Sequence, residues 1–116
     1  MSFNEQIKQI FKNFEVDGVK IPVEFLKYKG DKETYITFQE IIDSPALCGD
    51  NECEYSVKQF DFDIYTKGNY LNILKAVKQK LKDNGFTWVE DSTDMFENDT
   101  GYYHKTTTFE KENYIE

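Results

Sequence analysis

Residues 55–70 read YSVKQFDFDIYTKGNY and decide the fold of this chain. Apolar and polar residues alternate in this stretch, as they do in a strand with one face against a core and the other facing solvent or a partner. The core face holds Phe60, Phe62 and Ile64, and the opposite face holds Asp61, Asp63 and Tyr65. A Lys-Gly-Asn turn at 67–69 then leads directly into a helix.

That helix is predicted over residues 70–83. Asn69 is a suitable N-cap because its side chain can accept a hydrogen bond from the open amides of the first turn. The apolar stripe has helical spacing and consists of Tyr70, Ile73, Leu74, Val77 and Leu81. Asn84-Gly85 provides a left-handed stop, and Phe86 is placed to pack back on Leu81. The helix is therefore expected to lie on a sheet.

The N-terminal half predicts one more helix and two more strands. Residues 3–14 have the apolar spacing of an amphipathic helix that ends before Asp17-Gly18. Residues 21–28 and 34–41 are expected to form an antiparallel hairpin around a turn at 29–31. From Ile42 to Glu52 the alternation stops, which predicts a long loop with a small apolar island at 45–47.

After the second helix, residues 86–89 predict a short strand and residues 101–114 a long final strand. An acidic loop at 90–99 joins them, with Met95 and Phe96 expected to anchor it. The order is α-β-β-β-α-β-β. It predicts a single α+β domain over residues 1–116: a mainly antiparallel sheet of about five strands with both helices on one face.

The charge restricts the possible partners. The formal net charge is -8, and all 14 basic residues are lysines, since the chain contains no arginine. A negative surface without arginine forks argues against specific nucleic-acid binding. The first residues lack the apolar core of a secretion signal, and no stretch is long enough for a membrane helix, so we expect no membrane partner and a cytoplasmic location.

The chemistry-bearing residues do not form a recognised catalytic motif, and we expect no enzyme activity, no metal and no cofactor. His104 is the only histidine, and local spacing suggests no partner for it. A cation site at Asp91, Asp94, Glu97 and Asp99 fits no calcium loop, and solvent exposure explains Asp61 and Asp63. Cys48 and Cys53 are compatible with free thiols, an oxidisable pair or half of a metal site.

Several short segments, taken in order, resemble the tail-completion or tail-terminator proteins of long-tailed phages and prophages of Gram-positive bacteria. They lie at 39–41, 45–47, 63–70, 85–86 and 99–105, so the resemblance spans most of the chain. The motif residues are Asp63, Tyr65, Lys67, Gly68, Asn69, Tyr70, Asp99, Thr100, His104 and Lys105.

The resemblance implies a non-catalytic virion subunit that forms a ring, a hexamer, on the head-proximal end of the tail tube. Such a ring stops tube growth, binds the tail-tube protein and the head connector, and lets DNA pass. It assembles in the host cytoplasm and remains at the head-tail interface. The expected self-association loop holds Ile42, Pro45, Ala46, Leu47 and Asp50. A head-closure or neck component and an acidic DNA-mimic inhibitor are the alternatives.

Overall fold

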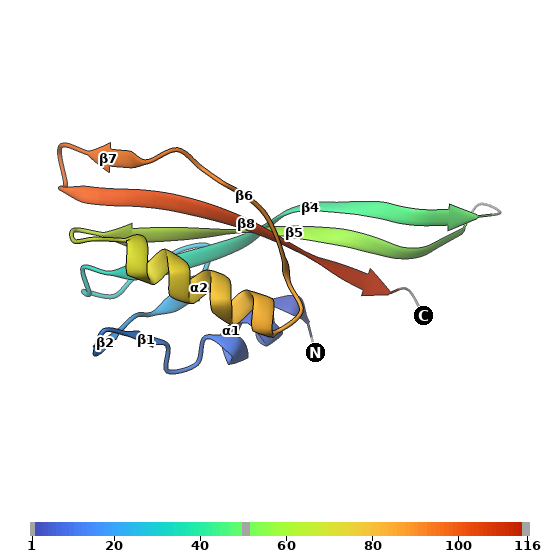
Figure 1. The fold of residues 1–116 in the computed structure, drawn as a ribbon, viewed down its shortest axis with the longest axis horizontal. Helices are drawn as coiled ribbons and strands as arrows, with labels where there is room; N and C mark the ends of the chain where they lie inside the picture. Colours follow the sequence, from blue (N-terminus) through green and yellow to red (C-terminus); the bar gives the residue numbers. More distant parts are fainter. Residues whose placement is uncertain (1, 50–51, 115–116) are drawn as a thin grey trace.

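The computed structural model describes residues 2–49 and 52–114 and has an α+β fold (Figure 1). The elements in chain order are α1 (Phe3–Ile10), β1 (Glu15–Val16), β2 (Val19–Lys20), β3 (Val23–Phe25), β4 (Tyr35–Gly49), β5 (Glu52–Thr66), α2 (Leu71–Asp83), β6 (Thr87–Asp91), β7 (Met95–Glu97) and β8 (Tyr102–Tyr114). The expected fold class is confirmed, although the strands are more numerous than expected.

One six-stranded sheet organises the molecule. Its strand order is β3-β4-β5-β8-β6, and β7 also pairs with β8. All these pairings are antiparallel except that of β3 with β4. Strand β5 lies at the centre and pairs with β8 without a register shift from Tyr55–Tyr114 to Thr66–Tyr103.

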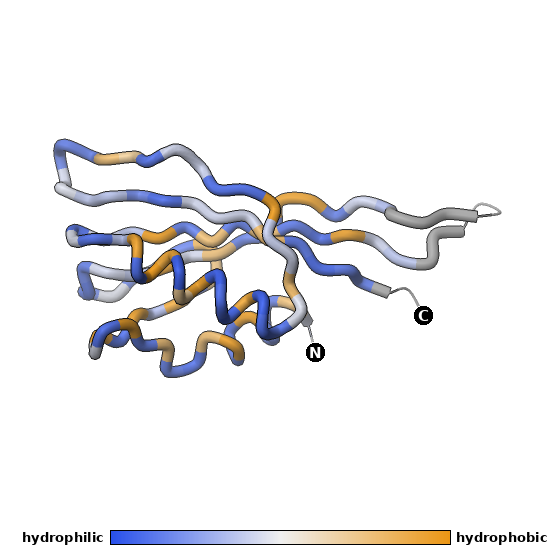
Figure 2. The backbone as a smooth tube through the Cα atoms, in the orientation of Figure 1, coloured by the Kyte–Doolittle hydropathy of each residue, from blue (hydrophilic) through white to orange (hydrophobic). Residues whose placement is uncertain are grey.

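Both helices cover the same face of this sheet, and the core lies between the two layers (Figures 1 and 2). The alternation in β5 is as predicted, because Phe60, Phe62 and Ile64 are buried on the helix side. Aromatic contacts join the layers: the ring of Phe11 in the α1 C-cap lies 6.0 Å from that of Phe62. The helices contribute Ile7, Phe11, Ile73, Val77 and Leu81 to this core.

The end of α2 follows the predicted chemistry. Gly85 has a φ of 86°, a conformation that glycine adopts without strain. The Phe86 N–H donates to the Leu81 carbonyl at 3.0 Å, which closes a Schellman motif. At the other end, the helix begins one residue later than expected, because Asn69 was predicted to be the N-cap. Tyr70 occupies the N-cap position, while Asn69 Oδ1 accepts from the Leu71 N–H at 2.9 Å.

Helix α1 is shorter than predicted. It ends at Ile10, and Asn13 has a left-handed φ of 57°. The buried side chain of Phe14 therefore belongs to a turn and not to the helix. The chain then forms the small β1–β2 hairpin, which was not predicted. Its turn is Asp17-Gly18, and both residues have positive φ, as a type I′ hairpin turn requires.

The predicted hairpin of residues 21–28 with 34–41 is wrong. Strand β3 has only three residues and pairs parallel to β4, with Val23 opposite Ile36. Pro22 precedes β3, and Leu26 follows it with a left-handed φ of 66°. Because the two strands run parallel, a short hairpin turn cannot connect them. The connection returns the chain to the start of β4, where the Tyr28 ring stacks on Tyr35 at 4.8 Å.

The predicted loop from Ile42 to Glu52 is also wrong. Residues up to Gly49 continue β4, and β5 starts at Glu52. Register shifts between Glu40 and Ile42 and on both sides of Leu47 let the strand pass through Pro45 while it remains paired. Pairing with β5 outweighs the weak strand propensity of these residues.

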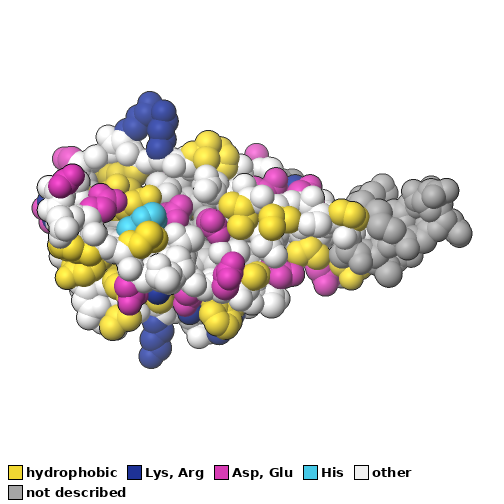
Figure 3. Space-filling model, turned by 90° about the horizontal axis from the view of Figure 1, so that it is seen from above, with side chains coloured by type: hydrophobic (Ala, Val, Ile, Leu, Met, Phe, Trp, Pro, Cys, Tyr) yellow, Lys and Arg dark blue, Asp and Glu magenta, His cyan; other side chains and the backbone are white. Residues whose placement is uncertain are grey.

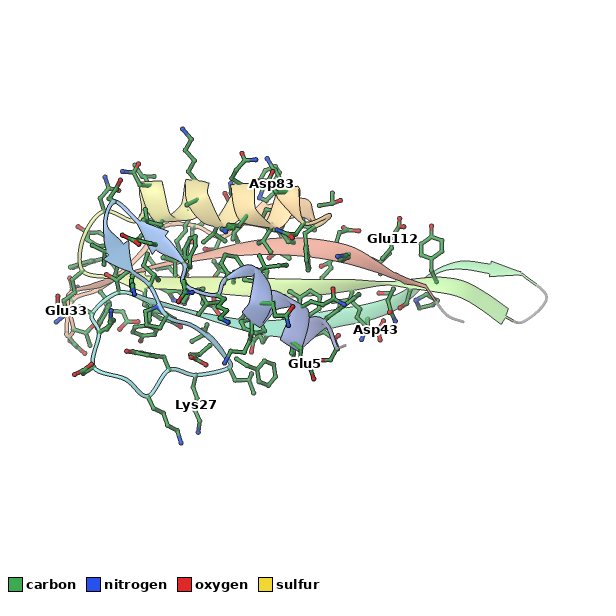
Figure 4. All side chains as sticks on the ribbon, turned by 90° about the horizontal axis from the view of Figure 1, so that it is seen from below. Glu5, Lys27, Glu33, Asp43, Asp83 and Glu112 are labelled. Atoms are coloured by element: carbon green, nitrogen blue, oxygen red, sulfur yellow. The ribbon has the colours of Figure 1, made fainter. Side chains whose placement is uncertain are left out.

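Residues 41–49 of β4 and 52–59 of β5 form an extension of the sheet that we call the arm. It projects past both helices and makes the molecule 53 Å long but only 27 Å wide (Figure 1). The C-terminal end of β8 pairs along the part of β5 that enters the arm. Figure 4 labels Asp43 and Glu112 where the arm leaves the helix-covered part of the molecule, which we call the body.

Half of the predicted acidic loop at 90–99 is strand, because β6 extends to Asp91 and β7 occupies Met95–Glu97. Met95 and Phe96 do not anchor it in the core, since they are 37% and 51% exposed. The Phe96 ring contacts the exposed Tyr103 ring at 4.8 Å instead. This edge of the sheet is therefore an apolar surface.

We expect Phe62→Ala to lower the free energy of unfolding by about 3–5 kcal/mol, because Phe62 is fully buried between Phe11 and Phe38. Phe96→Ala removes the same side chain from the exposed edge and is expected to change stability by less than about 0.5 kcal/mol. Urea unfolding of both variants measures the difference. Equal losses would contradict this assignment of the core.

Candidate functional site

The sheet face opposite the helices carries a row of stacked rings. Tyr35, Tyr65 and His104 are register partners on β4, β5 and β8. Tyr35 and Tyr65 stack at 4.9 Å, and Tyr65 and His104 stack at 4.3 Å. Tyr28 continues the row beside Tyr35. In Figure 3, the histidine lies among hydrophobic side chains, with acidic side chains nearby. Two of the motif residues, Tyr65 and His104, are therefore in direct contact.

His104 has a carboxylate partner that local spacing did not reveal. Its Nε2 lies 3.2 Å from Asp63 Oδ1, and Thr106 Oγ1 donates to the same oxygen at 2.5 Å. Thr106 Oγ1 also lies 3.4 Å from His104 Nε2, so the three side chains form one polar cluster. The three side chains connect β5 to β8 and fix the His104 ring against Tyr65. Only the β5–β8 register could have revealed the pair.

Burial and the neighbouring Asp63 carboxylate raise the pKa of Tyr65 to about 12. A buried phenol resists ionisation because the phenolate loses its hydration, and a nearby negative charge adds to that cost. Burial, with Tyr102 and Glu97, also raises the pKa of Tyr35. The phenols of Tyr35 and Tyr65 therefore remain neutral well above physiological pH.

Ultraviolet titration of the folded protein should show a tyrosine that ionises near pH 12, and Tyr65→Phe should remove that step. The folded state holds this proton more tightly than the unfolded chain does, so stability should fall as the pH rises above about 10. Tyr103→Phe serves as the control and should leave the step in place. A Tyr65→Phe titration that matches the wild type would contradict the assignment.

A second group of motif residues surrounds an open hollow of about 570 Å³ at the start of α2, lined by Lys67, Gly68, Asn69, Tyr70, Leu71, Asp94 and Tyr103. The Tyr70 hydroxyl donates to Asp94, which raises the pKa of the phenol and lowers that of the carboxyl. Lys105 Nζ donates to Asp94 at 2.9 Å and to the Ser92 carbonyl at 2.5 Å. Tyr70 and Lys105, from distant parts of the motif, thus hold the same carboxylate.

The remaining motif residues have structural contacts. Thr66 Oγ1 accepts from the Gly68 N–H at 3.2 Å. Lys67 lies over the Tyr102 ring at 5.2 Å. Thr100 Oγ1 donates to Glu97 at 3.0 Å in the turn before β8, and Asp99 lies in the same turn, exposed. These contacts stabilise the β5–α2 junction and the β7–β8 turn.

Asp91 forms a polar contact between α2 and the sheet that the sequence did not predict. Its carboxylate accepts from Lys78 Nζ at 2.6 Å, from Thr107 Oγ1 at 2.7 Å and from Trp88 Nε1 at 2.9 Å. Partial burial raises the pKa of Asp91, but these three donors outweigh it, and the net pKa is below its usual value. Asp91 and Asp94 are thus both engaged with lysines.

Replacing Asp91 with Asn should lower the free energy of unfolding by about 1–3 kcal/mol near neutral pH. The folded state stabilises the carboxylate, so this contribution is complete above the unfolded pKa of about 4 and is lost as the pH falls through the lower folded pKa. Urea unfolding at a series of pH values should give a shallower acid dependence for Asp91→Asn. Asp99→Asn, which changes the charge equally in an exposed turn, should behave as the wild type does; an identical profile for the two variants would contradict this role.

The expected self-association residues lie on the arm. Ile42 and Pro45 are exposed residues of β4, and Ala46 and Leu47 belong to the same strand. Asp50 lies outside the described residues. Cys48 and Cys53 are paired in the backbone register across the arm, a proximity that their sequence spacing did not establish. Within residues 2–49 and 52–114, no group of three or more metal-binding side chains is close enough to hold an ion.

Comparison with known proteins does not assign the chain to a family. No family model matches the chain, and no curated protein sequence matches it. Among the described helices, none combines the length and the apolar character needed to span a membrane.

Proposed function

We propose that this chain is a structural subunit of a long-tailed phage, the tail-completion protein that caps the head-proximal end of the tail tube. In this role, copies form a ring that stops tube growth and joins the tail-tube protein to the head connector. The resemblance of the motif residues to tail-completion proteins supports a position at the head-proximal end of the tail tube.

The observation that carries the proposal is the arm. The ends of β4 and β5 extend beyond both helices, so no helix covers them (Figure 1). Strands in this position add little to the buried core of a domain that functions alone. Ile41 and Ile42 are 42% and 44% exposed at the base of the arm. Exposed apolar residues on a projecting element are typical of an interaction surface. An assembly subunit has such a surface.

The uncovered sheet face supplies carboxylates for a ring that DNA crosses. Asp61 accepts from Thr108 at 2.6 Å, and Asp63 accepts from Thr106, so both are held in place on this face. If this face lines the channel, the negative charge repels DNA phosphates and lets DNA pass without sticking. We include this orientation in the proposal.

Particles made without this gene should have overlong or irregular tails that lack heads. Electron microscopy that scores tail length and head attachment together measures both effects, and a plasmid copy of the gene should restore normal particles. Tails of normal length that are detached from heads would favour the alternative that the protein is a neck component. Intact infectious particles would exclude a role in assembly and favour the inhibitor alternative.

A further inference from the structure

Two consecutive isoleucines at the base of the arm face the same side of the sheet. In a regular strand, neighbouring side chains point to opposite faces. A register shift between Glu40 and Ile42 leaves Ile41 without a partner on β5, as in a β-bulge. Ile42 lies opposite Gln59, which by alternation shares the uncovered face with Asp61. Ile41 lines a hollow of about 360 Å³ together with Asp61. The bulge therefore places both side chains, which we call the isoleucine pair, on the uncovered face.

The isoleucine pair is open to solvent. Both side chains are more than two-fifths exposed. The helices lie against the other face of the sheet, so they cannot cover the pair (Figure 1). In Figure 3, hydrophobic side chains continue along the uncovered face from the body to the arm. Adjacent aliphatic groups on a projecting element gain free energy when a partner removes them from water.

The hollow of about 570 Å³ at the start of α2, which we call the α2 hollow, lies at the end of the body away from the arm (Figure 1). Its charged groups are already engaged within the molecule. Lys67 Nζ lies 3.8 Å from Glu33, and Asp94 accepts from Lys105 Nζ at 2.9 Å. A hollow with internally compensated charges suits an apolar insert better than a charged ligand.

The walls of the α2 hollow are apolar and held in place. Leu71 and Tyr103 are 58% and 40% exposed, and the exposed Phe96 ring beside Tyr103 extends the apolar surface onto β7. The Tyr70 ring lies 5.9 Å from Lys105 Nζ, and its hydroxyl is bound to a carboxylate. Walls that are fixed before binding lose little conformational freedom when a partner arrives.

We propose that the isoleucine pair of one copy inserts into the α2 hollow of the next copy. The contact is heterologous, because two different surfaces of the same chain meet, and its repetition generates a ring when the rotation closes. It deepens the proposed function and rests on it for its place in the virion, since it supplies a subunit contact of the ring. It uses the base of the arm and leaves Asp63 and the row of stacked rings open toward the channel.

Contact between the isoleucine pairs of two copies is the other arrangement that a single chain offers, and charge disfavours it. Asp61 and Glu90 line the hollow beside Ile41. A symmetric contact would bring the same carboxylates of both copies together, and like charges across an interface weaken binding. The α2 hollow has no such excess of carboxylates, because its lining contains one lysine and one aspartate.

Two variants remove the two halves of the contact separately. Ile41→Ser with Ile42→Ser removes the isoleucine pair, and Gly68→Leu fills the α2 hollow. A Cβ added at Gly68 comes no closer than 3.9 Å to any group beyond its chain neighbours, so the new side chain fits without an internal clash. Each variant alone should self-associate at least about tenfold more weakly than the wild type in sedimentation equilibrium.

Val19→Ser with Leu26→Ser is the matched control. It also removes two exposed apolar side chains, from a different part of the surface, and should associate as the wild type does. Salt provides a second control. Raising its concentration from about 0.1 M to about 1 M should not weaken the wild-type association, because salt screens charges and not apolar contacts.

A mixture of the two defective variants tests whether the contact is heterologous. The serine variant keeps its α2 hollow, and the Gly68→Leu variant keeps its isoleucine pair. An equimolar mixture should therefore form dimers and nothing larger, because each dimer uses the only intact hollow and the only intact pair. A pair-to-pair contact would give no mixed dimer.

Three results would overturn the contact: a wild-type chain that stays monomeric at about 1 mM, a serine variant that associates normally, or a mixture without dimers. Isolated tail tubes that bind a monomeric wild type but not the serine variant would assign the isoleucine pair to the tube instead. The tail phenotype of the gene deletion does not depend on these outcomes, so failure of the contact and failure of the proposed function are distinguishable.

Discussion

The uninterrupted antiparallel register between β5 and β8 is the constraint on which the rest of the structure depends. It sets Phe60 opposite Phe109 on the helix side and Asp63 opposite Thr106 on the uncovered side. Because side chains alternate along a strand, a slip of one residue would move every apolar group out of the core. The same register continues to Tyr55 and Tyr114 and so carries the sheet from the body toward the arm.

The body and the arm are consequently stabilised by different interactions. In the body, helices bury the sheet on one side, and Asp91 joins α2 to β6 and β8 through hydrogen bonds. In the arm, backbone pairing continues where no helix covers the strands (Figure 1). Local stability follows buried apolar contacts, so the arm is the part that gains most from a partner.

Sequence patterns predicted the parts of the fold in which local chemistry and tertiary packing agree. The alternation of Phe60, Phe62 and Ile64 and the Gly85 stop were read correctly because each depends on neighbouring residues. The parallel β3–β4 pair, the strand through Pro45 and the Asp63–His104 contact were missed because each depends on the register of distant segments. The hollow that Lys8, Lys20 and Lys32 line together was missed for the same reason, since these residues come from three separate segments.

The central claim is that the arm is an assembly element, and hydrogen exchange of the free chain and of the chain within assembled tails tests it most directly. In the free chain, amides of residues 60–65 should exchange slowly and those of 52–58 faster. On assembly, the amides of the arm should become protected. Arm amides that exchange equally fast in both states would contradict the account.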